Sequence, residues 1–254
     1  MRIAAVQHDI AWEDAATTRS RLEPWIAAAA GAGARLVALT EMFATGFSMA
    51  TDRTAEPPDG PTTAWMVEQA ATHDVWLAGS VAIHLDAGDA RPSNTLLVVS
   101  PEGRVERYAK IHPFSYGGED EHFAPGERTL TLDVEGVRLT PLVCYDLRFA
   151  DLFWDLARET DAYLVVANWP AARRDHWRAL LDARAIENQA YVVGVNRVGE
   201  GGNGLSYAGD SRVVAPDGEV LVGAAREETL LLADLDPGAV RGTRDAYPFL
   251  RDRR

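Results

Sequence analysis

The sequence is poor in several residue types, and each scarcity excludes a class of protein. A single cysteine, Cys144, excludes a disulfide framework and a zinc site built from cysteines. No apolar run approaches the roughly 20 residues that a membrane-spanning helix needs. A formal net charge of -13 argues against a concentrated basic face for nucleic acid. The segment from Met1 to Val6 lacks the layout of a signal peptide. We therefore expect a soluble, cytoplasmic globular protein with no membrane or nucleic-acid partner.

Lysine is equally scarce. Of the 25 lysine and arginine residues only Lys110 is a lysine, so the other 24 are arginines. Lysine carries a compact charge with an adjustable pKa, whereas the guanidinium of arginine is a planar fork that stays protonated. Two interpretations remain open here: a guanidinium would not function at position 110, or the lysine was retained there by chance. The lone Cys144 poses a similar question, because a free cysteine is usually a small buried apolar residue.

Short apolar strands and amphipathic helices alternate along the chain. We expect helices over residues 14–30, 61–73, 149–159 and 175–188. We expect strands over residues 3–6, 35–39, 75–83, 95–100, 104–111, 137–143, 163–167, 191–196, 211–214, 219–221 and 230–233. A polar loop over residues 112–128 is long enough to suggest a function. The alternation continues without a linker or an internal repeat, which predicts one layered α/β domain over residues 1–254.

Three chemically active side chains follow predicted strands. Glu41, Lys110 and Cys144 each lie at or just beyond the C-terminal end of an apolar run, and this is the edge at which layered α/β folds bind ligands. The segment around Cys144 has a strand–nucleophile–helix layout, which presents a side chain on a tight turn. A thiol attacks as a thiolate, a carboxylate can accept its proton, and an ammonium can stabilise an oxyanion. The three residues together suffice for acyl transfer.

Other chemistries have weaker support in the sequence. The six histidines show no metal-ligand spacing, so no metal site is expected. A papain-like pair of Cys144 with His112 or His122 remains open, although the residues around Cys144 lack that signature. Residues 199–204 are glycine-rich without a P-loop lysine or a dinucleotide-binding pattern, which favours a flexible loop. An acidic run is typical of a solvated face from which one side chain could still point inward: Glu119, Asp120, Glu121 and Glu127.

Three segments resemble the signature blocks of the carbon–nitrogen hydrolase (nitrilase) superfamily, in the same order. They are Leu39-Thr40-Glu41-Met42-Phe43, Tyr108-Ala109-Lys110-Ile111-His112 and Val143-Cys144-Tyr145-Asp146-Leu147-Arg148-Phe149. The similarity extends from Ile3 to about Leu235. Further segments are similar to the bacterial omega-amidase branch, whose members hydrolyse the terminal amides of 2-oxoglutaramate and 2-oxosuccinamate: Ala167-Asn168-Trp169-Pro170, His176-Trp177, residues 183–191 and Gly209-Asp210-Ser211.

The resemblance implies a fold, a catalytic set and an oligomeric state. The fold is a four-layer αββα sandwich, usually dimerised, and no cofactor is implied. Carried over to this sequence, Glu41 is the general base, Lys110 the oxyanion stabiliser and Cys144 the nucleophile. The family's second glutamate precedes the glycine of a Pro-Gly pair by seven residues and corresponds to Glu119. One departure from the family pattern is Pro113, where leucine is expected, and it bears on the loop after Lys110.

The carboxylate of an oxo-acid substrate needs a cation. We predict that Arg173 supplies it through a bidentate contact. The adjacent Arg174 is the alternative, and Arg148 is expected to support the turn that carries the nucleophile. The backbone N–H of Tyr145 is expected to assist Lys110 at the oxyanion. Three further aromatic residues are candidates either for the pocket wall or for the core: Phe43, Tyr116 and Trp169.

Competing functions differ in kind from this prediction. Within the superfamily, a deaminated glutathione amidase and an N-carbamoyl-amine hydrolase remain open. A non-enzymatic scaffold would not need all of Glu41, Lys110 and Cys144. An amide-transfer subunit that supplies ammonia would require a synthetase partner. The sequence therefore predicts an omega-amidase that acts on small-molecule amides through a cysteinyl thioester and works as a homodimer.

Overall fold

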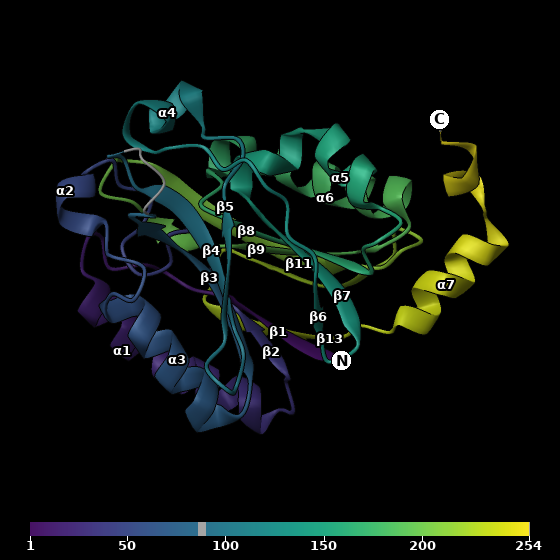
Figure 1. The fold of residues 1–254 in the computed structure, drawn as a ribbon, viewed down its shortest axis with the longest axis horizontal. Coiled ribbons are helices and arrows are strands. Elements are labelled where there is room, and N and C mark those ends of the chain that lie inside the picture. The colour runs from purple at the N-terminus through teal and green to yellow at the C-terminus, as the bar shows by residue number, and fades with distance from the viewer. Residues whose placement is uncertain (86–89, 254) are drawn as a thin grey trace.

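Strands and helices alternate along the chain in the order that the sequence predicts (Figure 1). The structure is a computed structural model and describes residues 1–85 and 90–253. The strands are β1 (Arg2–Gln7), β2 (Leu36–Ala38), β3 (Trp76–Ile83), β4 (Ser93–Val99), β5 (Val105–Ala109), β6 (Leu132–Val134), β7 (Val137–Val143), β8 (Ala162–Ala167), β9 (Tyr191–Asn196), β10 (Val198–Glu200), β11 (Ser206–Val214), β12 (Val220–Ala225) and β13 (Thr229–Asp234). The α-helices are α1 (Ala15–Gly31), α2 (Thr51–Thr54), α3 (Pro61–His73), α4 (Glu119–His122), α5 (Ala150–Leu156), α6 (Arg174–Asn188) and α7 (Pro237–Ala246). The 3-10 helices are η1 (Ser115–Gly117), η2 (Cys144–Arg148), η3 (Ala171–Arg173) and η4 (Phe249–Asp252).

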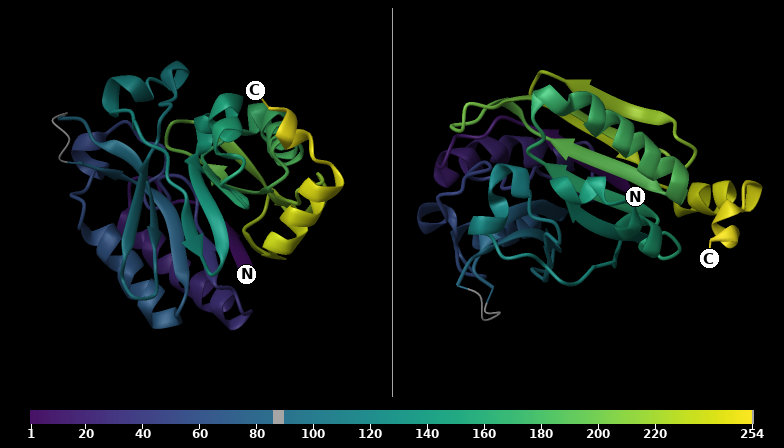
Figure 2. Two further views of the ribbon diagram at one scale, coloured as in Figure 1. Left: turned by 45° about the vertical axis from the view of Figure 1, so that its right-hand side comes forward. Right: turned by 90° about the horizontal axis from the view of Figure 1, so that it is seen from above.

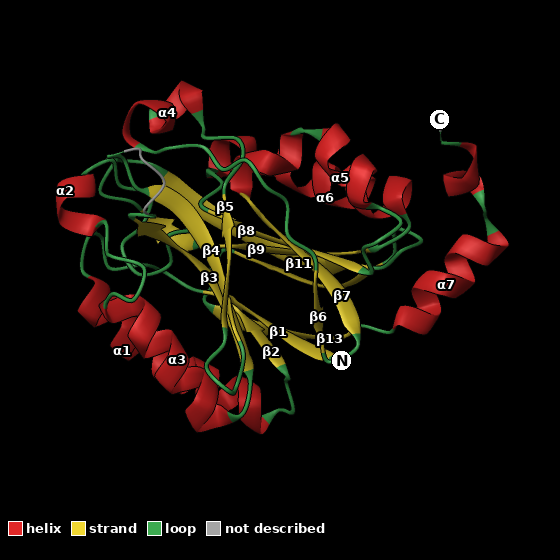
Figure 3. Cartoon of the chain, viewed as in Figure 1, coloured by secondary structure: helices red, strands yellow, loops and turns green. Residues whose placement is uncertain are grey.

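Two β-sheets pack face to face, and helices cover their outer faces (Figure 3). One sheet has six strands in the order β13-β1-β2-β3-β4-β5. The other has seven, in the order β10-β11-β9-β8-β7-β6 with β12 paired to β11. Helices α1 and α3 lie on the six-stranded sheet, and α5 and α6 lie on the seven-stranded sheet (Figures 1 and 3). This order of layers confirms the predicted αββα sandwich.

The side chains of β1 point alternately into two different cores, which explains why the strands of the first sheet are continuous apolar runs in the sequence. Ile3 and Ala5 belong to the core between the two sheets. Ala4 and Val6 belong to a second core, which includes Leu22 and other apolar residues of α1 and α3. Both faces of the sheet are therefore buried, and every position on the strand favours an apolar side chain.

Strand direction brings the ends of several strands to one edge of the sandwich. Strands β1, β2 and β3 are parallel, and so are β7, β8 and β9. Strand β4 runs antiparallel to β3 and β5 runs antiparallel to β4, so β5 points the same way as β2 and β3. The chain enters the loops described below from four strand ends. These are the C-terminal ends of β2 and β5 in one sheet and of β7 and β8 in the other.

The structure differs from the sequence prediction in several elements, and α2, β6 and β10 are among those that were not expected. The expected loop over residues 112–128 contains η1 and α4, and the helix expected over 149–159 ends at Leu156. Helix α7 was not predicted, because Gly238 and Gly242 weaken the helical pattern of its sequence. Asp236 caps its N-terminus through the N–H of Gly238, and Figure 2 shows the helix at the margin of the sandwich. No helix within the described ranges has the length and hydropathy to cross a membrane.

Candidate active site

Residues from both sheets meet at the strand ends. Glu41 lies three residues beyond Ala38, the last residue of β2, whereas Lys110 and Cys144 follow β5 and β7 directly. The Lys110 ammonium donates to Oε1 of Glu41 at 2.8 Å and to Oε2 of Glu119 at 2.7 Å. The side chains of these three residues are almost fully buried, with exposed fractions of 1%, 0% and 0%. Of the three N–H donors that an ammonium carries, one is left for a ligand.

Burial and charge act in opposite directions on this cluster. Burial lowers the pKa of Lys110, but the charges of Glu119 and Glu41 outweigh it, so the net pKa is raised. Burial raises the pKa of Glu119, and the opposing charge of Lys110 does not fully cancel this. Lys110 therefore remains an ammonium throughout the physiological pH range. The buried pair of carboxylates depends on that single positive charge.

Asn94 on β4 is a second donor that binds the carboxylates of both Glu41 and Glu119. Its Nδ2 donates to Oε1 of Glu41 at 2.9 Å and to Oε1 of Glu119 at 3.0 Å. The orientation of this amide is fixed because the hydroxyl of Ser80 donates to Asn94 Oδ1 at 2.8 Å. Sequence reasoning missed both residues. The only signal was a polar Ser-Asn-Thr sequence at the start of an otherwise apolar strand.

Cys144 lies at the sharp turn between β7 and η2. Its φ of 45° is in the left-handed region, which costs a non-glycine residue energy and is common at functional sites. Burial raises the pKa of the thiol well above its usual value, the charge of Glu41 adds to this effect, and the charge of Lys110 partly opposes it. The resting thiol is therefore neutral. A base must take its proton when it attacks, and Glu41 is the adjacent carboxylate.

Asp146 joins the turn at Cys144 to the chain after Lys110. Its Oδ2 accepts the N–H of Val143 at 3.0 Å and the hydroxyl of Tyr108 at 2.8 Å. Its Oδ1 accepts the backbone N–H of His112 at 3.0 Å and lies 2.9 Å from the Nδ1 of the same histidine. These contacts fix the nucleophile turn relative to the end of β5.

The histidines do not support a papain-like pair. His112 contacts Asp146 and stacks on Phe149 with ring centroids 3.6 Å apart. Neither His112 nor His122 lines the cavity that contains Cys144. Among the residues that the structure describes, no group of three or more His, Cys, Asp or Glu side chains is placed to hold a metal ion.

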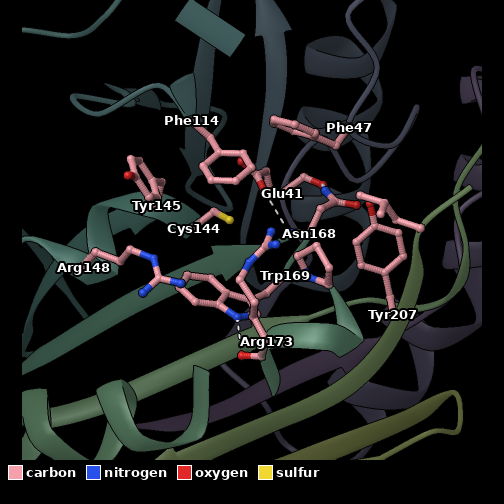
Figure 4. A pocket seen from close by; sticks show the side chains of 12 residues that line it. Glu41, Phe47, Phe114, Cys144, Tyr145, Arg148, Asn168, Trp169, Arg173 and Tyr207 are labelled. Carbon is pink, nitrogen blue, oxygen red and sulfur yellow. Dashed lines mark hydrogen bonds between the residues drawn. The ribbon is translucent and has the colours of Figure 1, made fainter. Parts of the chain in front are cut away.

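A cavity with about 410 Å³ of empty space, part of it open to solvent, lies over the thiol (Figure 4). Glu41, Cys144 and Asn168 contribute its polar groups, and Arg148 and Arg173 are its cations. The other residues that line it are Phe47, Phe114, Tyr145, Trp169, Pro170, Leu205 and Tyr207. The arrangement combines a thiol, a carboxylate and two guanidinium groups within largely apolar walls.

The structure places three of the predicted substrate-binding residues in this wall and corrects two. Tyr145, Trp169 and Arg173 line the cavity. Phe43 is fully buried in the core against α1 and α3, with its ring 5.9 Å from that of Trp65. Tyr116 is 86% exposed and lies outside the cavity. Phe47 and Phe114 occupy the wall instead, a difference of a few residues that apolar periodicity does not resolve.

The arginines differ in the partners that they already have. Arg174 donates through Nε and Nη2 to both carboxylate oxygens of Asp210, each at 2.8 Å. The guanidinium of Arg173 lies 5.4 Å from the ring centre of Phe114. Arg148 lies over the ring of Trp169 at 4.7 Å. Its expected support of the nucleophile turn is provided by Arg184, which donates to the carbonyl of Leu147 at 3.1 and 3.0 Å.

Comparisons with known proteins agree on one family. The carbon-nitrogen hydrolase family profile matches residues 2–245. The chain is 39% identical over 253 residues to the omega-amidase YafV of Escherichia coli strain K12, covering 99% of this chain and 96% of the relative. It is 32% identical over 225 residues to the 2-oxoglutaramate amidase of Bacillus subtilis strain 168, covering 86% and 85% of the two chains.

A solved structure of the same superfamily is similar to this chain in fold and sequence. XC1258 from Xanthomonas campestris, described as a CN-hydrolase superfamily protein with an arsenic adduct in the active site, superposes with a TM-score of 0.94. It is 38% identical in sequence, and the match covers 100% of this chain and 97% of the other.

Proposed function

The chain belongs to the carbon–nitrogen hydrolase family, and from this premise we propose that it is an omega-amidase. In this proposal it hydrolyses the terminal amide of 2-oxo acids such as 2-oxoglutaramate and 2-oxosuccinamate, releasing the dicarboxylate and ammonia. The relatives named omega-amidase and 2-oxoglutaramate amidase support this substrate class. The proposal includes the homodimeric state that the resemblance implies and the cytoplasmic location expected from the composition of the sequence.

The observation that carries the proposal is the guanidinium of Arg173 in the cavity that contains the Cys144 thiol (Figure 4). Among the described residues, no carboxylate forms an ion pair with Arg173, whereas Arg174 already has Asp210. A cation in an apolar pocket favours an anionic ligand, because its attraction for a carboxylate is strong where water is excluded. A small amide that carries a carboxylate at its far end meets this requirement.

In the first half of the proposed reaction, Cys144 becomes acylated. Glu41 accepts the thiol proton while Sγ forms a bond to the amide carbon. The third N–H of Lys110 and the backbone N–H of Tyr145 stabilise the developing oxyanion, and each such donor contributes about 3 kcal/mol. The carbon–nitrogen bond then breaks as Glu41 passes the proton to nitrogen. Ammonia departs, and the acyl group remains bound to Cys144 as a thioester.

In the second half, water releases the acid. Glu41 accepts a proton from the water as its oxygen attacks the thioester carbon, and the same donors stabilise the second oxyanion. The carbon–sulfur bond breaks, and the proton held by Glu41 returns to Cys144. Glu119 acts through Lys110, which it holds at 2.7 Å, and therefore positions the ammonium rather than reacting with substrate.

The Arg173 assignment predicts a selective loss of substrate affinity. Arg173→Gln is expected to raise KM for 2-oxoglutaramate about tenfold to a hundredfold, because a charge-assisted hydrogen bond is worth about 1.5–3 kcal/mol. Turnover of a neutral amide such as butanamide should change little. Steady-state ammonia release with both substrates measures the difference.

Arg174→Gln is the matched control for this prediction. Its guanidinium is already held by Asp210, so KM for 2-oxoglutaramate should remain near that of the wild type. A rise in KM confined to Arg174→Gln would show that Arg174, and not Arg173, binds the substrate carboxylate. A rise for neither variant would shift attention to Arg148, the other arginine of the cavity.

A panel of amides tests the activity itself. We expect the purified protein to release ammonia from 2-oxoglutaramate and 2-oxosuccinamate in clear preference to glutamine and deaminated glutathione. Preference for deaminated glutathione, or activity only on an N-carbamoyl amine, would instead identify another amidase of the family. Absence of ammonia release from both oxo-amides would refute the proposed substrate class.

A further inference from the structure

Asn168 packs directly around the proposed base. It follows the last residue of β8, and its backbone N–H donates to Oε2 of Glu41 at 2.7 Å. Its side-chain Nδ2 donates to the backbone carbonyl of Glu41. Figure 4 shows Asn168 beside Glu41 in the wall of the cavity. One residue thus contacts Glu41 through both its main chain and its side chain.

The other side-chain atom, Oδ1, is left without a partner. Asn168 is only 4% exposed, and no described residue donates a hydrogen bond to its Oδ1. The orientation of the amide is not ambiguous, because the Glu41 carbonyl can only accept and must therefore face Nδ2. Leaving a buried acceptor unpaired costs about 1–3 kcal/mol, so native proteins seldom do so without a reason.

The position of this atom distinguishes it from other unpaired groups. Buried side-chain atoms of five further described residues also lack a partner, and none of those residues lines the active-site cavity: Thr63, Gln189, Arg197, Arg212 and Arg253. Asn168 is the described residue that combines a buried unpaired acceptor with a place in the wall beside Cys144 and Glu41.

We propose that Oδ1 of Asn168 accepts a hydrogen bond from the amide nitrogen of the substrate and makes the site selective for carboxamides. The inference rests on the proposed amide hydrolysis. There the carbonyl oxygen binds Lys110, and the nitrogen must lie near Glu41 to receive its proton. Asn168 binds Oε2 of Glu41 whereas Lys110 binds Oε1, so Asn168 is assigned to the nitrogen side of the scissile bond and Lys110 to the oxygen side.

The chemistry of the leaving group explains the selectivity. A primary amide nitrogen has two N–H donors, one of which can satisfy Oδ1. The alkoxy oxygen of an ester has no hydrogen and would face Oδ1 with its lone pairs. An ester of the same acyl group therefore gains nothing from Asn168 and leaves the buried acceptor unpaired, the situation in which polar sites discriminate most strongly.

The test compares 2-oxoglutaramate with the 5-methyl ester of 2-oxoglutarate in wild type and variants. Asn168→Ala is expected to lower kcat/KM for the amide about tenfold to a hundredfold more than for the ester, since one unpaired buried group is worth about 1–3 kcal/mol. Asn168→Asp keeps a side-chain acceptor at this position, so the amide-to-ester ratio should stay near the wild-type value even if both rates fall. All of these variants retain the backbone N–H that contacts Glu41.

Two further variants keep the result decisive. Asn168→Ser keeps a small polar side chain but is too short to replace Oδ1, so it takes the place of the alanine variant if that protein does not fold. Asn196→Ala is the matched control. Its side chain is buried, does not line the cavity, and binds the backbone of Trp169 and Gly209. It should affect amide and ester equally.

An equal loss for amide and ester in Asn168→Ala or Asn168→Ser would overturn the inference. A fall in the amide-to-ester ratio of Asn168→Asp as large as that of Asn168→Ala would also overturn it, because the effect would then come from the lost Nδ2 contact and not from Oδ1. If the wild-type enzyme does not hydrolyse 2-oxoglutaramate, that result refutes the proposed function and not this inference. In that case, the same ratio is measured with the amide and methyl ester of the acyl group that it does hydrolyse.

Discussion

Lys110→Arg is expected to lower kcat for amide hydrolysis at least about a hundredfold, the usual effect of losing one preorganised oxyanion donor. The charge is retained in this variant, so the effect isolates geometry. Lys110 reaches Glu41 and Glu119 at 2.8 and 2.7 Å from a single nitrogen, and the proposed mechanism assigns its remaining N–H to the oxyanion. A planar guanidinium cannot place three donors around one point, and it adds volume to a site that is 1% exposed.

The measurement is steady-state ammonia release together with thermal unfolding of the variant. A reverse exchange, Arg178→Lys on the exposed face of α6, serves as the control and should leave both quantities near wild type. Near-normal turnover of Lys110→Arg would show that position 110 needs only a positive charge. The scarcity of lysine in the chain would then carry no information about this site.

Cys144→Ser is expected to reduce turnover by about 10⁴-fold or more, as the loss of a catalytic nucleophile does in other hydrolases. A serine hydroxyl is far less acidic than a thiol, so its proton is much harder to remove when it attacks. The substitution keeps a β-carbon at φ 45°, so the strain of the turn is unchanged and the fold should survive. Intact-mass measurement during turnover should detect an acyl adduct on the wild type and none on the variant.

Retention of substrate binding by the serine variant separates chemistry from structural damage. Its Kd for 2-oxoglutaramate, measured by calorimetry, should be close to the wild-type KM if acylation is slow relative to substrate release. A serine variant with substantial amidase activity would remove Cys144 from the role of nucleophile. Loss of binding together with loss of activity would indicate that the turn had rearranged.

The elements that the sequence predicted well are those with a strong local pattern. Helix α3 begins at Pro61 and ends at His73 as expected, because proline suits the first helical position and the buried residues recur at helical spacing. Strand β7 covers residues 137–143 as predicted, since both of its faces favour apolar residues. Helix α7 escaped prediction because its contacts are tertiary: Arg244 donates to the carbonyls of Ala157 and Thr160, far away in the sequence.

The same distinction applies to the site. Glu41, Lys110 and Cys144 could be proposed because each is a reactive side chain at a strand end, a position that the sequence reveals. Asn94 and Asn168 could not be assigned roles, because their importance lies in contacts with Glu41 across 53 and 127 residues of chain. The choice of Arg173 over Arg174 likewise depends on the position of Asp210, which no local pattern encodes.

The pairing of the first and last strands has a consequence for synthesis of the chain. Strand β1 pairs with β2 on one side and with β13 on the other, from Arg2 opposite Asp234 to Gln7 opposite Thr229. The ribosome makes β1 before β2 and makes β13 only after both of them. One edge of a buried, apolar strand therefore remains open until β13 has emerged. An open edge of this kind invites pairing with other nascent chains. Cotranslational folding of the six-stranded sheet cannot finish early, and truncated chains that end before Thr229 are expected to be prone to aggregation.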